Sequence, residues 1–143
     1  MPRFVCALAI VLLAPHIGAQ QREPGVPDIP AMQALWANVK SALSGPNGQK
    51  YFEENLKDFE LPYLYGVVIS STPKDQPHVL VLAMSDKSTP EVSLTVEGGG
   101  HLTQGVRDGA EVIFEGVPTA FSKQPFRLTI TTRQKVRVHD PSQ

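Results

Sequence analysis

The fold class is decided by two segments, VLVLAM at residues 79–84 and EVSLTV at residues 91–96, with the turn-forming DKSTP between them. The first segment is continuously apolar, as in a buried strand. The second alternates apolar and polar residues with the period of two that places one face of a strand inside and the other outside. Both segments are therefore predicted to be strands. The predicted inward positions are Val92, Leu94 and Val96, and the predicted outward positions are Glu91, Ser93 and Thr95.

The same period extends over most of the chain after Tyr63. Three further segments rich in β-branched and aromatic residues are predicted strands, at Gly66–Ser70, Ala110–Val117 and Phe126–Thr132. Turn-forming clusters separate the five strands. Five short strands with such turns predict a small β-sandwich or a barrel. The face shared by Phe126, Leu128 and Ile130 is expected to continue through Val136 and Val138.

A helical period precedes the strands. Apolar residues recur at i, i+3, i+4, i+7 and i+11 from Met32 to Leu43, which defines one face of a helix. Asp28 is a suitable N-cap, and Gly45-Pro46 ends this helix. A second helix is predicted over Gln49–Phe59, before Pro62. Its predicted apolar face comprises Tyr51, Phe52, Leu56 and Phe59.

The segment GVRDGAEVIFEGV at residues 105–117 resembles part of an OB-fold barrel. Small barrels of this type often carry a tight turn and then a fourth strand of the form G-x-x-V-x-F-x-G, which is matched here from Gly109 to Gly116. Gly66 in the first strand and the break at residues 98–108 also fit. The resemblance implies a mainly β (α+β) fold, in which two short helices precede a five-stranded, OB-like antiparallel barrel.

A second resemblance covers Gly48–Ile130. Several pieces are similar to an uncharacterised domain of exported bacterial proteins, which sometimes follows tetratricopeptide repeats. The resemblance implies an envelope-associated module and carries no catalytic residues. The pieces are KYFEENLKD at 50–58, SSTP at 70–73, VLVL at 79–82, FEGV at 114–117 and PFRLT at 125–129.

The first nineteen residues predict export. A short basic start at Met1–Arg3, an apolar run at Phe4–Leu13 and the small residue Ala19 form the pattern of a secretory signal peptide. The apolar run is shorter than the ~20 residues that a bilayer-spanning helix needs. The predicted organisation is a signal peptide (1–19), a flexible leader (20–29), one domain with the helical pair and the barrel (30–139), and a tail (140–143).

Composition narrows the function classes. Cys6, the single cysteine, lies in the signal peptide, so the processed chain is expected to have no disulfide, thiolate metal site or cysteine nucleophile. The formal net charge of -1 becomes -2 once Arg3 is removed, and this near-neutral balance argues against bulk electrostatic binding of nucleic acid. No second apolar run follows the signal. We therefore expect a periplasmic or extracellular protein that is soluble after cleavage and does not span a membrane.

A basic stripe is the strongest candidate binding feature. The side chains of Arg127, Arg133, Lys135 and Arg137 share odd parity with Thr129 and Thr131, so they line one face if the strand runs that far. A stripe of this kind could dock an acidic partner or an anionic polymer. The alternative interpretation is cross-strand pairing with Glu111 and Glu115 of the preceding strand.

Aromatic residues suggest two further surfaces. Tyr63 and Tyr65 lie two residues apart in the first strand region and form a candidate binding edge. Trp36 and the rings of the second helix either pack onto the barrel mouth or line a groove between helices and barrel for a peptide, sugar or lipid.

The remaining polar residues carry no recognisable chemistry. The histidines that survive cleavage are not at metal-ligand spacing, so no metal site and no cofactor are predicted. An enzyme would require His101, Asp108 and a hydroxyl residue to meet in one cleft. We therefore expect a non-enzymatic binding or assembly module of the cell envelope, which contacts an envelope protein or a glycan through a barrel face. The alternative is a carrier or sensor for a small ligand or glycan, with a groove between helices and barrel.

Overall fold

The computed structural model describes residues 28–140. The predicted signal peptide (1–19), leader residues 20–27 and tail residues 141–143 lie outside this range. In the described part, the chain forms helical segments first and strands afterwards, as the change of period predicts. No helix of this part is long and apolar enough to cross a bilayer.

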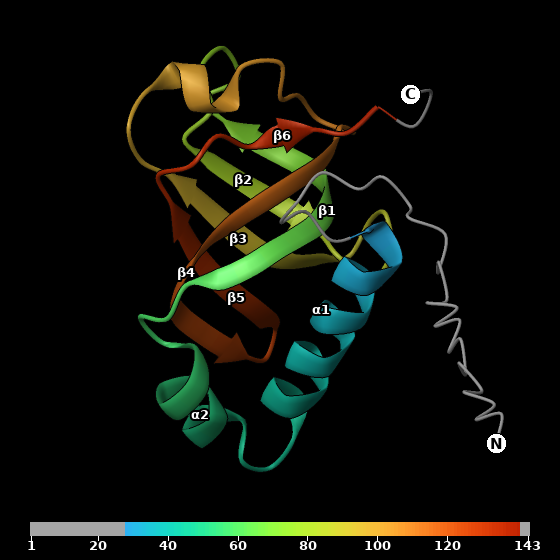
Figure 1. Cartoon of the computed structure of the whole chain (residues 1–143), viewed down its shortest axis with the longest axis vertical. Coiled ribbons are helices and arrows are strands. Elements are labelled where there is room, and N and C mark those ends of the chain that lie inside the picture. The colour runs from blue at the N-terminus through green and yellow to red at the C-terminus, as the bar shows by residue number, and fades with distance from the viewer. Residues whose placement is uncertain (1–27, 141–143) are drawn as a thin grey trace, which may run out of the picture.

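Five strands close into a barrel in the order β1-β2-β3-β5-β4-β1 (Figure 1). A two-residue strand, β6 (Arg137–Val138), adds to β4 outside the barrel. The fold class is therefore the predicted one: mainly β (α+β), with an OB-like barrel after two short helices. The barrel strands are β1 (Leu61–Thr72), β2 (Val79–Ala83), β3 (Pro90–Val96), β4 (Glu111–Lys123) and β5 (Phe126–Thr132).

The direction of one strand pair differs from the sequence prediction. An antiparallel barrel was expected, and the pairs β1–β2, β2–β3, β1–β4 and β4–β5 are antiparallel. The pair β3–β5 is parallel, so the barrel is mixed. Parallel neighbours need a long crossover connection, and here η2 (Gly100–Thr103) and β4 supply it. Strand patterning alone does not reveal such a connection.

The first helix follows its predicted start and face. Helix α1 (Ile29–Ser44) begins after Asp28, whose Oδ1 accepts a hydrogen bond from the Ala31 backbone N–H at 2.8 Å. Figure 1 shows α1 running along one side of the barrel towards its lower end. The residues that α1 buries are Met32, Trp36, Val39 and Leu43.

The second helix is shorter than predicted. It comprises α2 (Gly48–Tyr51) and the π-helical turn η1 (Phe52–Leu56), so it ends three residues before Phe59. Asp58 adopts a left-handed conformation with φ 65°, and its N–H donates to the carbonyl oxygen of Pro118 on β4. This tertiary contact turns the chain towards β1. Phe59 is consequently 57% exposed, and its predicted place on the apolar face is wrong.

Every second residue of the barrel strands points inward, and these residues form the core. The inward positions predicted for β3 are confirmed, because Val92, Leu94 and Val96 are all buried. At the barrel end away from α2, Val136 is buried with residues of η2, whereas Val138 lies on β6 and is 46% exposed. Val136 therefore joins the core as expected, whereas the expected continuation to Val138 is wrong. The residues with no exposed surface are Leu43, Leu80, Leu82, Ala83, Val92, Leu94, Val112, Leu128 and Ile130.

Truncation of an inward residue should cost far more than truncation of an outward one. Leu94→Ala is expected to lower the free energy of unfolding by about 2–5 kcal/mol, because it leaves a cavity in the closed barrel. Val138→Ala on β6 should change it by about 0.5 kcal/mol at most. Urea unfolding followed by circular dichroism measures both, and similar losses in the two variants would contradict this core.

Candidate functional site

The outer face of β3 and β5 carries a regular array of paired polar side chains. The parallel register places Ser93 beside Thr129 and Thr95 beside Thr131. The same register, extended by one outward-facing residue pair at each end, places Glu91 beside Arg127 and Glu97 beside Arg133. We call these four pairs the outer ladder. Its two charged rungs enclose two rungs of hydroxyls, over about 20 Å at roughly 3.3 Å per residue.

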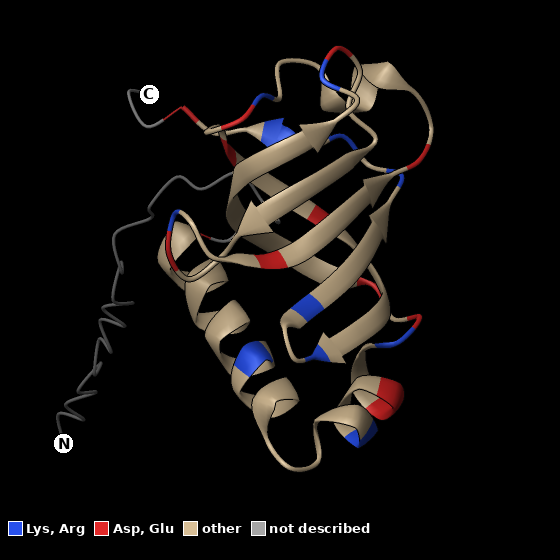
Figure 2. Cartoon of the chain, turned by 180° about the vertical axis from the view of Figure 1, so that it is seen from behind, with Lys and Arg blue, Asp and Glu red and all other residues tan. Residues whose placement is uncertain are grey.

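The hydroxyl rungs are half-buried and lie in an uncharged part of the sheet. On one side they adjoin Val79 and Val81 of β2, and on the other Val117 and Ala120 of β4. Figure 2 views the molecule from behind and shows these strands tan over most of their length. Hydroxyl groups can both donate and accept hydrogen bonds. The middle of the ladder therefore offers polar contacts without charge.

The Glu97–Arg133 rung is open to solvent. Arg133 Nε lies 3.4 Å from Glu97 Oε2, and the two side chains are 82% and 50% exposed. Such a pair stabilises a fold little, by about 0–1 kcal/mol. This rung borders a groove of about 440 Å³. The polar residues that line the groove are Glu60, Glu97, Thr119, Thr131, Thr132, Arg133 and Gln134.

Gly116 also lines this groove, at a close approach of β4 to β5. A Cβ atom there would lie 2.6 Å from Cγ2 of Ile130 and 2.7 Å from the carbonyl oxygen of Thr131. Only a residue without a side chain fits this distance. Gly116 therefore allows β4, which forms one wall of the groove, to lie close to Thr131 on β5.

The Glu91–Arg127 rung is covered by α1. Glu91 was predicted to face outward, and it does leave the barrel interior, but only 1% of it is exposed. Its Oε2 accepts hydrogen bonds from Trp36 Nε1–H at 2.8 Å and from the Ser85 hydroxyl at 3.2 Å. Lys40 Nζ lies 3.2 Å from Oε1. The helix thus buries the acid that the strand pattern alone would leave in water.

Two buried polar atoms of this rung make no hydrogen bond, Glu91 Oε1 and Arg127 Nε. They are the only such side-chain atoms in residues 28–140. Lys40 is within ion-pair distance of Oε1, but a hydrogen bond also needs an alignment that the pair lacks. The attraction of Lys40 therefore offsets only part of the free-energy cost of burying the Glu91 carboxylate.

The predicted basic stripe divides into two parts. Arg127 and Arg133 lie on the outer ladder, but β5 ends at Thr132, where the Gln134 backbone N–H donates to the Thr132 hydroxyl at 3.1 Å. Lys135 and Arg137 therefore leave the face, and the premise of one continuous strand is wrong. The alternative partners Glu111 and Glu115 form no ion pair with these four cations within the described part.

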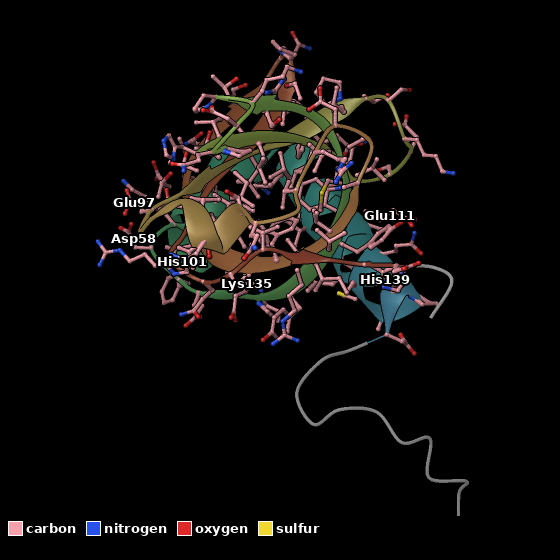
Figure 3. All side chains as sticks on the ribbon, turned by 90° about the horizontal axis from the view of Figure 1, so that it is seen from above. Asp58, Glu97, His101, Glu111, Lys135 and His139 are labelled. Atoms are coloured by element: carbon pink, nitrogen blue, oxygen red, sulfur yellow. The ribbon has the colours of Figure 1, made fainter. Side chains whose placement is uncertain are left out.

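Arg137 joins the tyrosine edge instead. Its guanidinium carbon lies 5.5 Å from the ring centroid of Tyr63. The Tyr65 hydroxyl donates to Glu111 Oε1, and its ring packs edge-on against His139. Tyr65 is only 9% exposed, so this edge is largely occupied by contacts within the chain. Figure 3 shows Glu97 and His139 on opposite sides of the barrel, so the tyrosine edge is remote from the open rung of the ladder.

The space between helix and barrel is mostly filled. Trp36 is 2% exposed and packs edge-on against Phe126, with ring centroids 6.0 Å apart. Two surface hollows remain beside Gln33 and Ser85: one of about 340 Å³ that Trp36 and Ala37 also line, and one of about 160 Å³ that Tyr65 also lines. The packed indole ring argues against the predicted alternative of a ligand groove at this place.

The residues considered for catalysis do not assemble. Asp108 accepts hydrogen bonds from the Ser71 hydroxyl at 3.0 Å and from Lys74 Nζ at 2.7 Å. These two bonds, with that of Lys74 foremost, hold the pKa of the Asp108 carboxyl below its usual value. His101 is not among these partners. Within residues 28–140, no three histidine, aspartate or glutamate side chains are placed to hold a metal ion.

The chain matches no protein-family model, and no curated protein matches it. The geometry of the ladder is therefore the basis on which a function is assigned.

Sequence reasoning found the basic side of the ladder and missed its acidic side. The partners Glu91 and Glu97 were assigned no role, because β3 was not expected beside β5. A signal was present: E-x-S-x-T-x-E at 91–97 and R-x-T-x-T-x-R at 127–133 have the same length and spacing. Two such segments can pair along their whole length.

Removal of the Glu91 carboxylate should destabilise the fold. Glu91→Ala is expected to lower the free energy of unfolding by about 1–3 kcal/mol, because it leaves the buried Trp36 N–H without a partner. Glu91→Gln retains an oxygen acceptor and should cost less. Urea unfolding of both variants measures the difference, and a Glu91→Ala protein as stable as the native one would contradict the role of this contact.

Tyr65 should produce a pH dependence at alkaline pH. Burial, followed by the hydrogen bond and charge of Glu111, raises the pKa of Tyr65 from 10.0 to about 12. Its contribution to stability is thus complete below pH 10 and is lost as the pH rises towards 12, because the unfolded chain ionises first. Tyr65→Phe should reduce the loss of stability between pH 10 and pH 12. Identical pH slopes of the unfolding free energy in the two proteins would show that Tyr65 has no such shift.

Proposed function

We propose that this protein is an exported, non-enzymatic binding module of the cell envelope that contacts its partner through the outer ladder. The observation that carries the proposal is the ladder itself: polar residues set side by side on two neighbouring strands, bordered at one end by an open groove. Structural ion pairs on a barrel surface need no hydroxyl rungs between them. A face that binds a partner needs polar groups at regular spacing and a rigid support.

The support is rigid because both ladder strands lie inside the sheet. Strand β3 pairs with β2 and β5, and β5 pairs with β3 and β4. Inward residues of both strands are fully buried in the core. A site on such strands is held more closely than a site on loops. This arrangement favours recognition through fixed groups over capture by a closing lid.

Export is part of the proposal and follows from the signal-peptide pattern of residues 1–19. Cleavage after Ala19 would give a processed chain that starts at Gln20 and acts in the periplasm or outside the cell. The absence of cysteine after residue 6 means that such a chain folds without disulfides in an oxidising compartment. The closed apolar core of the barrel supplies the stability instead.

Site-specific photocrosslinking in intact envelopes tests the contact face. A benzophenone side chain at Thr95, in the middle of the ladder, should form a crosslinked product. The same group at Val138, which is exposed on β6, should not. N-terminal sequencing of the recovered protein should begin at Gln20.

A product at Val138 but not at Thr95 would contradict the outer ladder as the contact face. No product at either position would contradict a binding module of this kind. A chain that retains residues 1–19 would contradict export by signal cleavage.

A further inference from the structure

We infer that the partner of the outer ladder is an uncharged glycan built from hexoses, recognised at the Glu97–Arg133 rung and the groove beside it. This inference rests on the function proposed above and names the class of its partner. It depends on the charge of the ladder, the hydrogen-bonding groups of the groove and the closed edges of the two strands.

Charges of both signs lie on and around the ladder in nearly equal number. The positive charges come from Lys40, Arg127 and Arg133, and the negative charges from Glu60, Glu91, Glu97 and Glu115. A surface of mixed sign does not complement an anionic polymer or a strongly basic peptide. It suits a partner that is polar and neutral.

The groove presents donors and acceptors that remain free to bind. Arg133 contacts Glu97 through Nε alone, at 3.4 Å, and its side chain is 82% exposed. A guanidinium has five N–H donors in a planar fork, so four of them are free of this contact. Gln134 adds an exposed amide, and Glu60 adds a carboxylate. Neighbouring sugar hydroxyls both donate and accept, and such a mixed set of groups can satisfy them in pairs.

The ladder continues this chemistry beyond the groove. Thr131 belongs to both the groove and the last hydroxyl rung, so a chain seated in the groove can extend over Thr129 and Ser93. The flanking side chains of Val79 and Val117 are small and apolar, and they can contact the C–H faces of a sugar ring. The covered Glu91–Arg127 rung ends the accessible surface at α1.

Other polymers fit this face less well. An extended peptide can add to a sheet only at an open strand edge, and both edges of β3 and of β5 are paired. Single-stranded nucleic acid needs positive charge and aromatic platforms for its bases. The ladder has neither a net positive charge nor an aromatic residue.

An exposed ring lies near the same groove in the chain. Phe59 directly precedes Glu60, which lines the groove, and Phe59 is 57% exposed. The left-handed turn at Asp58 and its hydrogen bond to Pro118 fix this segment next to β4. Apolar rings are the usual platform for the C–H face of a bound ring. The chain therefore carries an exposed aromatic residue directly before Glu60 of the groove.

Binding of defined hexasaccharides tests the inference. The full processed chain is titrated by calorimetry with maltohexaose, cellohexaose and mannohexaose, and with a heparin hexasaccharide as the charged comparison. At least one neutral hexasaccharide should bind. Arg133→Ala should weaken that binding about tenfold or more, the loss expected for one charge-assisted hydrogen bond. Arg107→Ala removes an exposed arginine away from the ladder and should leave binding unchanged.

The inference is overturned if no neutral hexasaccharide binds, if heparin binds more tightly than all of them, or if Arg133→Ala binds as the native protein does. Crosslinking at Thr95 then separates the two proposals. If a protein is crosslinked to Thr95, the proposal of a binding module stands and the inference of a glycan partner is refuted. If no product forms at Thr95, both are refuted. A glycan joined to Thr95 that also binds in the titration supports both.

Discussion

The parallel pairing of β3 with β5 is the constraint on which the candidate site depends. It sets two seven-residue segments of matched spacing side by side, so that their inward residues fill the core and their outward residues form the ladder. Direction matters as much as adjacency. In an antiparallel arrangement Glu91 would face Arg133, and the other arginine would lie at the groove. The parallel direction places Arg127 beside the buried Glu91 and leaves Arg133 in solvent.

The two ends of the ladder differ because only one of them is covered by a helix. Trp36 and Lys40 are one turn apart on α1, so both reach Glu91. The resulting contact ties α1 to β3, although a buried charge is costly and its carboxylate is only partly compensated. At the other end, Glu97 and Arg133 remain exposed and bind each other weakly. Similar residues thus hold the fold at one end and are free for a partner at the other.

Local patterns predicted much of the fold. The cap at Asp28, the buried face of α1 and the inward positions of β3 all follow from capping and periodicity, which act within a few residues. Features that depend on distant contacts were missed. The end of the second helix is set by the bond from Asp58 to Pro118, and the split of the basic stripe by the turn after Thr132. The acidic half of the ladder was missed because no local sequence pattern indicates that β3 lies beside β5.

The most direct test of the central claim is the measurement of cross-strand nuclear Overhauser effects between β3 and β5 in solution. The structure predicts contacts of the parallel pattern, linking Ser93 with Thr129 and Thr95 with Thr131. Contacts that link Ser93 with Thr131 and Thr95 with Thr129 would show antiparallel strands. That result would place Arg133 beside the buried Glu91, remove the open Glu97–Arg133 rung and contradict the proposed contact face.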